Sequence, residues 1–247
     1  MISLLPLPGL PELRPGDDLG AELAGAAPPD MASDDVLVVS HKVVSKMEGR
    51  VRALADVEPG ERAHALAAEH GKDARLLQVV LDETRELLRA ERGVLICETH
   101  TGLVCANAGV DQSNVADGLA VLLPEDPDAS ARRVRAAVGA ARGVLPAVVI
   151  ADSFGRAWRL GQVDVAIGAA GLAVLDDWRG RRDREGRELR ATAIAVADAV
   201  AAAADLARAK DSGEPAVLVR GLERYVDHED GPGASALRRA REEDLFR

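Results

Sequence analysis

Short oxygen-bearing side chains follow two apolar segments of the sequence. The segment CANAGVDQSN brings Asp111, Ser113 and Asn114 close together after a Gly-containing turn. The segment AVVIADS places Asp152 and Ser153 directly after an apolar run. Carboxylate, amide and hydroxyl oxygens are the ligands that hard divalent cations prefer. If the two strand ends face one site, Asp111 and Asp152 would hold divalent cations that screen the charge of nucleotide phosphates, as phosphoryl transfer requires.

The same residue types have a second explanation without any metal. Asp, Ser and Asn side chains also accept backbone hydrogen bonds in Asx-turns and at helix N-termini. Composition alone favours an Asx-turn that leads into a helix cap for the segment with Asp111. The segment with Asp152 could likewise be a turn in which Arg156 pairs with an exposed acid. Both interpretations stay open at the level of the residues.

Two further polar segments could contact phosphate. The segment SHKVVSKMEG follows an apolar run and contains Lys42 and Lys46, but it lacks the GxxxxGK[ST] spacing of a P-loop. Lys46 could still hold a phosphate as a point charge, although a single lysine is usually solvated. The N-terminal segment PGLPEL is a rigid turn that could present backbone amides.

An aspartate interrupts a strand that is otherwise apolar. Asp164 lies in the segment GQVDVAIG, where burial would require a hydrogen-bonded partner. Arg159, Arg179 and Arg187 are candidate partners. Each of these arginines could pair with Asp164 structurally, or could receive an anionic substrate through bidentate contacts.

The elements that must position these residues are strands and helices in mixed order. Short β-branched runs predict strands at 36–39, 94–97, 147–151, 163–167 and 216–219. Helical periodicity predicts helices at 131–141, at 188–208, and from Asp73 onward with an apolar face made by Leu76, Leu77, Val80, Leu81, Leu87 and Leu88. A hairpin is expected between Glu98 and Val104. Because strands follow one another directly, we predict an α+β fold rather than a doubly wound sheet.

The predicted organisation is a single domain over residues 1–247, large enough for two lobes. The linker-like stretches at 24–34 and 209–214 are too short to separate independent domains. The charged tail at 227–247 is predicted to be solvated, with a final helix from Ala234 onward.

Composition excludes several classes of partner. Only 2% of the residues are aromatic, which argues against a base-stacking platform, and the formal charge is −10, which repels polyanions. We therefore expect no nucleic-acid partner. The N-terminal segment lacks the basic region of a signal peptide, and Asp198, Asp205 and Arg208 interrupt the Ala-rich segment at 191–209. We predict a closely packed helix there, no membrane partner and a cytoplasmic location.

The two cysteines indicate neither a disulfide framework nor a zinc site. Cys97 and Cys105 are too few for the former and lack the second pair that a site with two CxxC motifs needs. We expect two small buried thiols.

Several segments resemble, in order, the coenzyme F420-0:γ-glutamyl ligase family. They are LPGLPELRPGDDL, KVVSKMEGR, CANAGVDQSNV, ADSFGRAWRLGQVDVAIGAAG, DWRGRRDREGREL and PAVLVRG, and they span nearly the whole chain. The resemblance implies a GTP-dependent ligase that joins L-glutamate to the carboxylate of coenzyme F420-0, a phospholactyl deazaflavin, through an acyl phosphate, and then extends a γ-linked glutamate tail. The implied cofactors are Mg²⁺ or Mn²⁺, with K⁺ as a further candidate. The implied architecture is an intertwined homodimer of α+β subunits.

The resemblance also implies roles for individual residues. Asp111 and Asp152 match the metal-binding and catalytic aspartates, and Ser153 matches the adjacent metal-associated position. The implied nucleotide contacts are Leu10, Pro11, Glu12, Leu13, His41, Lys46 and Asn114. The loop Ala207 to Glu214 matches the segment that closes over the nucleotide.

One position departs from the family pattern. His41 stands where the family usually has a hydroxyl residue, so we expect its ring to take over the hydrogen bond to the nucleotide. Two alternatives stay open: a ligase of the same fold that acts on another carboxylate acceptor, and a non-catalytic protein that binds deazaflavin or nucleotide.

Overall fold

The computed structural model describes residues 1–209 and 211–246, and its centre is a mixed five-stranded sheet. The strands follow the order β1 (Ser3–Pro6), β12 (Ala216–Arg220), β2 (Val36–Ser40), β8 (Ala147–Arg156) and β9 (Arg159–Ala170). The pair β2 and β8 is parallel, and the other neighbours are antiparallel. The prediction of an α+β fold is confirmed.

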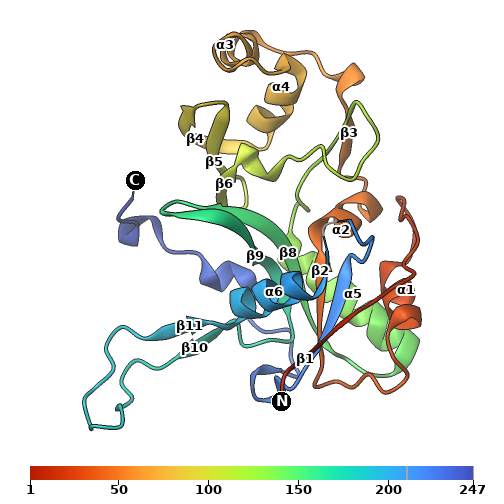
Figure 1. Ribbon diagram of the computed structural model, residues 1–247, viewed down its shortest axis with the longest axis vertical. Helices are drawn as coiled ribbons and strands as arrows, with labels where there is room; N and C mark the ends of the chain where they lie inside the picture. Colours follow the sequence, from red (N-terminus) through yellow and green to blue (C-terminus); the bar gives the residue numbers. More distant parts are fainter. Residues whose placement is uncertain (210, 247) are drawn as a thin grey trace.

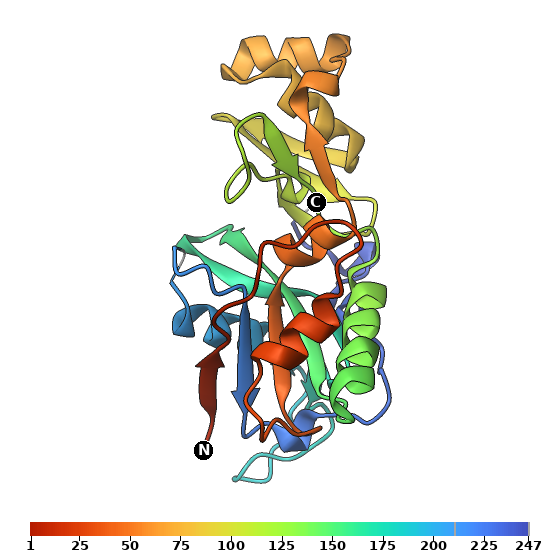
Figure 2. The ribbon, with the colours of Figure 1, turned by 90° about the vertical axis from the view of Figure 1, so that its right-hand side faces the viewer.

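Helices cover both faces of this sheet, which explains why its central strands are apolar without alternation. In β2, Leu37 and Val39 face one core, whereas Val36 and Val38 face the other. Figures 1 and 2 show the arrangement: α1 (Leu19–Ala26) and α5 (Pro127–Arg142) pack on one face, and α6 (Val196–Ala207) packs on the other.

A second lobe stands above the sheet in Figure 1 and has its own core around Leu77, Leu95 and Leu122. It contains α3 (Glu61–His70), α4 (Ala74–Asp82), a three-stranded sheet of β4 (Thr84–Glu91), β5 (Val94–Thr99) and β6 (Val104–Ala106), and the pair β3 (Val51–Ala53) with β7 (Leu119–Val121). The predicted hairpin between Glu98 and Val104 is confirmed as β5 and β6.

Local signals explain where the longest helix begins and ends. The Asp126 side chain accepts a hydrogen bond from the backbone N–H of Ala129 at 2.9 Å, and Pro127 occupies the first helical turn. Gly143 ends α5 in the left-handed conformation, with a φ of 71°. The helix predicted at 131–141 is therefore confirmed, and its cap extends it to residue 127.

The helix predicted from Asp73 is shorter than its apolar pattern indicated. Asp73 caps α4 as expected, but the helix ends at Asp82. Leu87 and Leu88 lie in β4, which pairs with β5 in an antiparallel hairpin. The prediction that they belong to the helix was wrong. Their spacing continues the helical pattern by coincidence, and pairing with β5 determines their conformation instead.

The helix predicted at 188–208 begins later, at Val196. The residues before it belong to a projecting arm formed by β10 (Leu175–Asp177) and β11 (Ala193–Ala195), which is visible in Figure 1. The alanines of α6 do pack closely, since Ala197, Ala201 and Ala204 are all fully buried. No helix within residues 1–209 and 211–246 is long and apolar enough to cross a membrane.

The C-terminal tail at 227–246 is largely exposed, as predicted, although Gly233 and Ala234 are buried. It forms 3₁₀ turns rather than a helix. Arg135 of α5 is buried, binds Asp230 at 2.8 Å and donates hydrogen bonds to the carbonyl groups of Asp227 and His228. Among the described residues, the 3₁₀ turns are Leu54–Asp56, Asn107–Gly109, Glu223–Tyr225, Ala234–Leu237 and Arg241–Glu243.

Candidate active site

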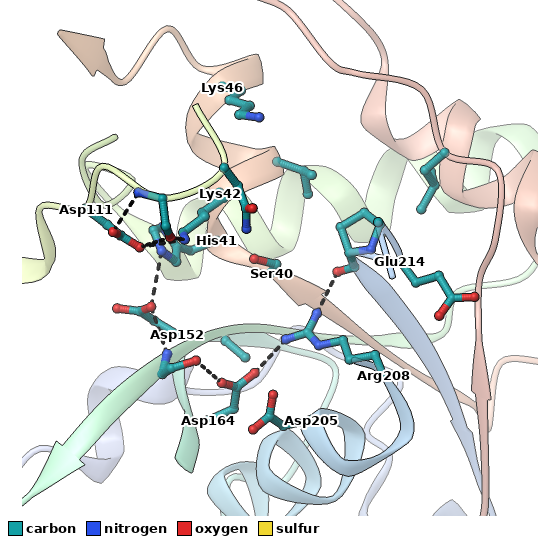
Figure 3. Close-up of a pocket in the computed structure, with 18 of the residues that line it drawn as sticks. Ser40, His41, Lys42, Lys46, Asp111, Asp152, Asp164, Asp205, Arg208 and Glu214 are labelled. Carbon is teal, nitrogen blue, oxygen red and sulfur yellow. Dashed lines mark hydrogen bonds and ion pairs between the residues drawn. The ribbon is translucent and has the colours of Figure 1, made fainter. Parts of the chain in front are cut away.

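A cavity of about 620 Å³ opens where the central sheet meets the second lobe, and Figure 3 shows its interior. Its polar lining comes from segments far apart in the sequence: Glu12, Ser40, His41, Lys42, Lys46, Asp111, Ser113, Asn114, Asp152, Ser153, Gln162, Asp164, Asp205, Arg208 and Glu214. The two polar segments that the sequence singled out therefore do line one cavity. Asp152 lies within β8, which continues to Arg156, so the alternative interpretation of a turn at Asp152 was wrong.

The parallel pairing of β2 and β8 places the first acidic residue. Ser40, the last residue of β2, pairs with Ala151 of β8, so Asp152 lies just past the end of β2, beside the start of α2 (His41–Met47). The His41 ring is 1% exposed, and its Nε2 atom lies 3.2 Å from Oδ1 of Asp152 without hydrogen-bond geometry. Its Nδ1 atom lies 3.4 Å from Oγ of Ser45. The ring thus contacts protein groups on both sides, and its contact with a nucleotide stays a prediction.

The second lobe contributes Asp111. The backbone N–H of Ser113 donates to Oδ1 of Asp111 at 2.9 Å, and the Ser113 hydroxyl donates to Oδ2 at 2.7 Å. This is the Asx-turn that the alternative interpretation described, and it faces the cavity. Asn114 follows in the left-handed conformation with a φ of 57° and also lines the cavity. The Asx-turn at Asp111 therefore does not exclude a binding site at the same residues.

A lysine from α2 neutralises Asp111. The Nζ atom of Lys42 lies 2.5 Å from Oδ2 of Asp111 and also donates to the Ser113 hydroxyl. Burial raises the pKa of the Asp111 carboxyl, but hydrogen bonds from Lys42 and Ser113 outweigh it and lower the pKa to about 2. Asp111 is therefore ionised at neutral pH.

Ser153 begins a buried chain of polar contacts. Its backbone N–H donates to Asp152 at 2.8 Å, and its hydroxyl donates to Oδ1 of Asp164 at 2.6 Å. Asp164 is 1% exposed, and its Oδ2 atom accepts a hydrogen bond from Arg208 at 2.6 Å. Arg208 also donates to the carbonyl oxygen of Pro215 at 3.0 Å.

The sequence correctly indicated that Asp164 needs a partner but named the wrong arginines. The partner is Arg208, whereas Arg179 pairs with Asp177 of the projecting arm at 2.6 Å. The pairing joins residues 44 apart in the sequence, which no local pattern reveals.

The N-terminal segment passes over the cavity. Leu10, Pro11 and Glu12 line it, and Glu12 lies 2.5 Å from the Nζ atom of Lys46. Leu13 is instead 3% exposed and packs in the hydrophobic core, so its side chain does not line the cavity. Leu10, Pro11 and Glu12 of the predicted nucleotide contacts therefore line the cavity, whereas Leu13 does not.

The loop predicted to close over a nucleotide also borders the cavity. Arg208, Ala209, Gly213 and Glu214 contribute to the lining. Lys210, which belongs to the same predicted segment, lies outside the described residues.

The donor set fits a hard cation that completes its coordination with a ligand. Within residues 1–209 and 211–246, no group of three His, Cys, Asp or Glu side chains is placed to hold a metal ion. Asp111, Asp152 and Ser153 nevertheless offer oxygen atoms to one cavity, and the buried Nε2 atom of His41 has no hydrogen-bond partner. Mg²⁺ is commonly bound through one or two carboxylates plus substrate phosphates and water, which matches this sparse set.

Lys42 and Arg208 are basic groups of the cavity that received no individual role from the sequence, although both lie in segments that it connected with the nucleotide. The spacing of Lys42 and Lys46 is i, i+4, which places both on one face of a helix, so the pair could have been found. Arg208 had no such signal, because its role depends on the contact with Asp164.

Both cysteines are free and buried, which confirms the expectation for them. Burial, together with the nearby charges of Asp152 and Cys97, raises the pKa of Cys105 to about 12, so it remains a thiol at neutral pH.

Comparison with known proteins agrees with the resemblance in the sequence. The family model described as F420-0:Gamma-glutamyl ligase matches residues 9–221. The coenzyme F420:L-glutamate ligase of Methanopyrus kandleri is 44% identical over 248 residues, which cover 100% of this chain and 98% of that protein. The coenzyme F420:L-glutamate ligase of Methanothermobacter thermautotrophicus is 42% identical over 250 residues, which cover 100% of this chain and 99% of that protein. The corresponding ligase of Haloarcula marismortui is 44% identical over 246 residues, which cover 97% of this chain and 93% of that protein. The chain is therefore a ligase and belongs to the F420-0:gamma-glutamyl ligase family.

Proposed function

We propose that the protein uses GTP to form an amide bond between L-glutamate and the carboxylate of coenzyme F420-0, and then extends a γ-linked glutamate tail. The names of the relatives support the two substrates. The observation that carries the proposal is the cavity itself, in which Asp111 of the second lobe and Asp152 of the sheet face the basic groups of Lys42, Lys46 and Arg208. Such a combination suits a phosphorylated ligand and a divalent cation together.

The proposed reaction has two steps. The γ-phosphoryl group of GTP passes to an oxygen of the acceptor carboxylate, which forms an acyl phosphate and releases GDP. The deprotonated amine of glutamate then attacks the acyl carbon, the C–N bond forms, and inorganic phosphate leaves. The cation, Mg²⁺ or Mn²⁺, would neutralise charge on the transferred phosphoryl group. The protein aligns the reactants and supplies fixed charges, which are the main contributions available to a phosphoryl-transfer enzyme.

Individual residues have distinct tasks in this proposal. Asp111, Asp152 and Ser153 would hold the cation, and Lys46 would contact a phosphate. Asn114 lines the same cavity and would contact the nucleotide. The hydrogen bond from Ser153 to buried Asp164 fixes the hydroxyl rotamer, so its oxygen can face a ligand without further ordering.

Removing one carboxylate charge tests the assignment. Asp111→Asn and Asp152→Asn should each fold normally and lose most ligase activity, with partial recovery at high Mn²⁺ if only metal affinity is reduced. Activity is measured by mass spectrometry of coenzyme F420-0 after incubation with glutamate, GTP and Mg²⁺ or Mn²⁺. The matched control is Asp73→Asn, which replaces one good cap of α4 by another outside the cavity and should keep activity. Near-normal turnover in either cavity variant at limiting metal would contradict the assignment.

Isotope transfer tests the acyl phosphate. When the acceptor carboxylate carries ¹⁸O, one labelled oxygen should appear in the released phosphate, because that oxygen bridges the acyl and phosphoryl groups. Product formation without labelled phosphate would overturn the two-step route while leaving the ligase function in place.

We further propose a cytoplasmic homodimer, with K⁺ as an accessory cation. Exposed apolar side chains support association: Trp158 is 81% exposed and Leu160 is 97% exposed at the turn between β8 and β9. Light scattering at low micromolar concentration should give twice the mass of the 25.9 kDa chain, and a monomer mass throughout that range would contradict the dimer.

A further inference from the structure

The contact between Lys42 and Asp111 connects the two lobes across the cavity. Lys42 lies in the first turn of α2 beside the central sheet, whereas Asp111 belongs to the second lobe. The Lys42 side chain is 17% exposed and the Asp111 side chain 42%. The Oδ2 atom of Asp111 faces both the ammonium group of Lys42 and the hydroxyl of Ser113, and its Oδ1 atom accepts the backbone N–H of Ser113. Both carboxylate oxygens therefore already have donors.

A divalent cation at Asp111 would lie beside the ammonium group of Lys42. Mg²⁺ lies about 2.0–2.1 Å from a carboxylate oxygen. The Lys42 ammonium lies 2.5 Å from the same carboxylate, so the two cations would come within a few ångströms of each other. At that separation like charges repel strongly in a partly buried site. A divalent cation that binds Asp111 therefore competes with Lys42 for the carboxylate.

The cavity offers Lys42 another kind of partner. Lys46 lies one helical turn further along α2, lines the same cavity and contacts Glu12. Two ammonium groups on one helix face thus point into a space that would hold the phosphates of a nucleotide. Lysine is a compact charge on a flexible stem, so it can exchange a carboxylate for a phosphate by rotating its side chain.

We propose that Lys42 is an exchangeable counter-cation: it neutralises Asp111 before the metal binds and moves to a phosphate oxygen when metal and nucleotide enter together. This rests on the proposed function, because it takes the cavity to be the site for metal and nucleotide. Lys46 contacts a different carboxylate, Glu12, so its departure does not change the charge beside Asp111. Lys42 therefore competes with a metal that binds without nucleotide, whereas Lys46 does not.

The test compares Mn²⁺ binding with and without nucleotide. Free Mn²⁺ is measured by electron paramagnetic resonance in titrations of the full chain, first with Mn²⁺ alone and then with a non-hydrolysable GTP analogue. Lys42→Met keeps the apolar stem of the side chain and removes its charge. This variant should bind Mn²⁺ alone about tenfold more tightly than the wild type, because the hydrogen bond between Lys42 and Asp111 no longer competes with the metal. The same variant should bind the Mn²⁺ complex of the analogue more weakly, because a phosphate contact is lost.

Two variants serve as controls. Lys42→Arg keeps the charge and should bind Mn²⁺ alone as the wild type does. Lys46→Met should weaken binding of the analogue but leave the affinity for Mn²⁺ alone unchanged. Melting temperatures establish that each variant is folded, and Lys42→Gln replaces Lys42→Met if the latter does not fold.

The outcomes separate the exchange from the ligase function. Unchanged or weaker binding of Mn²⁺ alone by Lys42→Met overturns the exchange, and so does a failure of both the wild type and this variant to bind Mn²⁺. If the wild type forms the glutamylated product but binds Mn²⁺ alone as tightly as Lys42→Met does, the ligase function stands and the exchange is refuted. If Lys42→Met binds Mn²⁺ alone more tightly than the wild type but the wild type forms no glutamylated product, the exchange stands and the proposed function is refuted.

Discussion

Replacing Arg208 by Met removes the cation from a buried ion pair beside the cavity. The Arg208 side chain is 10% exposed and that of Asp164 is 1% exposed. A carboxylate that loses its cation in such surroundings keeps the cost of desolvation without the attraction that offset it. The Ser153 hydroxyl still donates to Asp164 in the variant, so part of the stabilisation remains.

The expected loss can be bounded from these contacts. Removing one member of a buried ion pair typically costs about 3–5 kcal/mol of unfolding free energy. Because the hydrogen bond from Ser153 is kept, we expect about 3 kcal/mol, at the lower end. For a chain of this size such a loss lowers the melting temperature by roughly 6–12 °C. Urea denaturation followed by circular dichroism gives the free energy directly.

The control is an exposed pair of the same chemistry. Arg241 and Glu86 lie 2.8 Å apart with side chains 59% and 40% exposed, so Arg241→Met should cost less than about 1 kcal/mol. Combining Arg208→Met with Asp164→Asn should restore part of the loss, since no charge is then left buried in the pair. If Arg208→Met costs no more than Arg241→Met, the ion pair does not stabilise the fold in the way argued.

Two further predictions concern packing and pH. A Cβ atom at Gly20 would lie 2.2 Å from that of Ala137, whereas one at Gly25 of the same helix would meet nothing within 4 Å. Gly20→Ala should therefore lose about 1–3 kcal/mol and Gly25→Ala should not; equal denaturation midpoints would contradict this. Burial raises the pKa of Asp198 despite a hydrogen bond from the backbone N–H of Ala166, so the wild type loses stability as the pH rises through the folded-state pKa. Asp198→Asn should avoid this loss, and its stability relative to the wild type should grow between about pH 3 and pH 7 in urea titrations; a constant difference would show that the carboxyl group is not destabilised by burial.

Local patterns predicted the central strands better than the ends of the strands. The segments around Asp111 and Asp152 were identified from an apolar run followed by short polar residues. In the structure, β8 continues past Asp152 to Arg156, and a 3₁₀ turn separates β6 from Asp111. The central strands were found because burial on both faces leaves no polar alternation. This signal depends on neighbours in the sequence, and the structure confirms both strands as β2 and β8.

Contacts between distant segments could not be predicted in the same way. His41 appeared to be a substitute for a nucleotide-contacting hydroxyl, but its ring is buried against Asp152, more than a hundred residues later. The partner of Asp164 was likewise chosen from nearby arginines, although Arg208 reaches it from the end of α6. Such pairings are set by how helices and strands pack, and periodicity carries no information about them.

The position of Asp111 follows from how the second lobe is inserted into the fold. The chain leaves the sheet after β2 and α2, builds the second lobe, and returns through α5 to β8. The entry and exit of this insertion are tied together, because Val51 of β3 pairs with Val121 of β7. Asp111 also forms a backbone bridge with Val121, with N···O distances of 3.0 Å and 2.8 Å. The base of the insertion therefore holds Asp111 above α2, which places a carboxylate from the second lobe opposite Asp152 without requiring the rest of that lobe to contact the sheet.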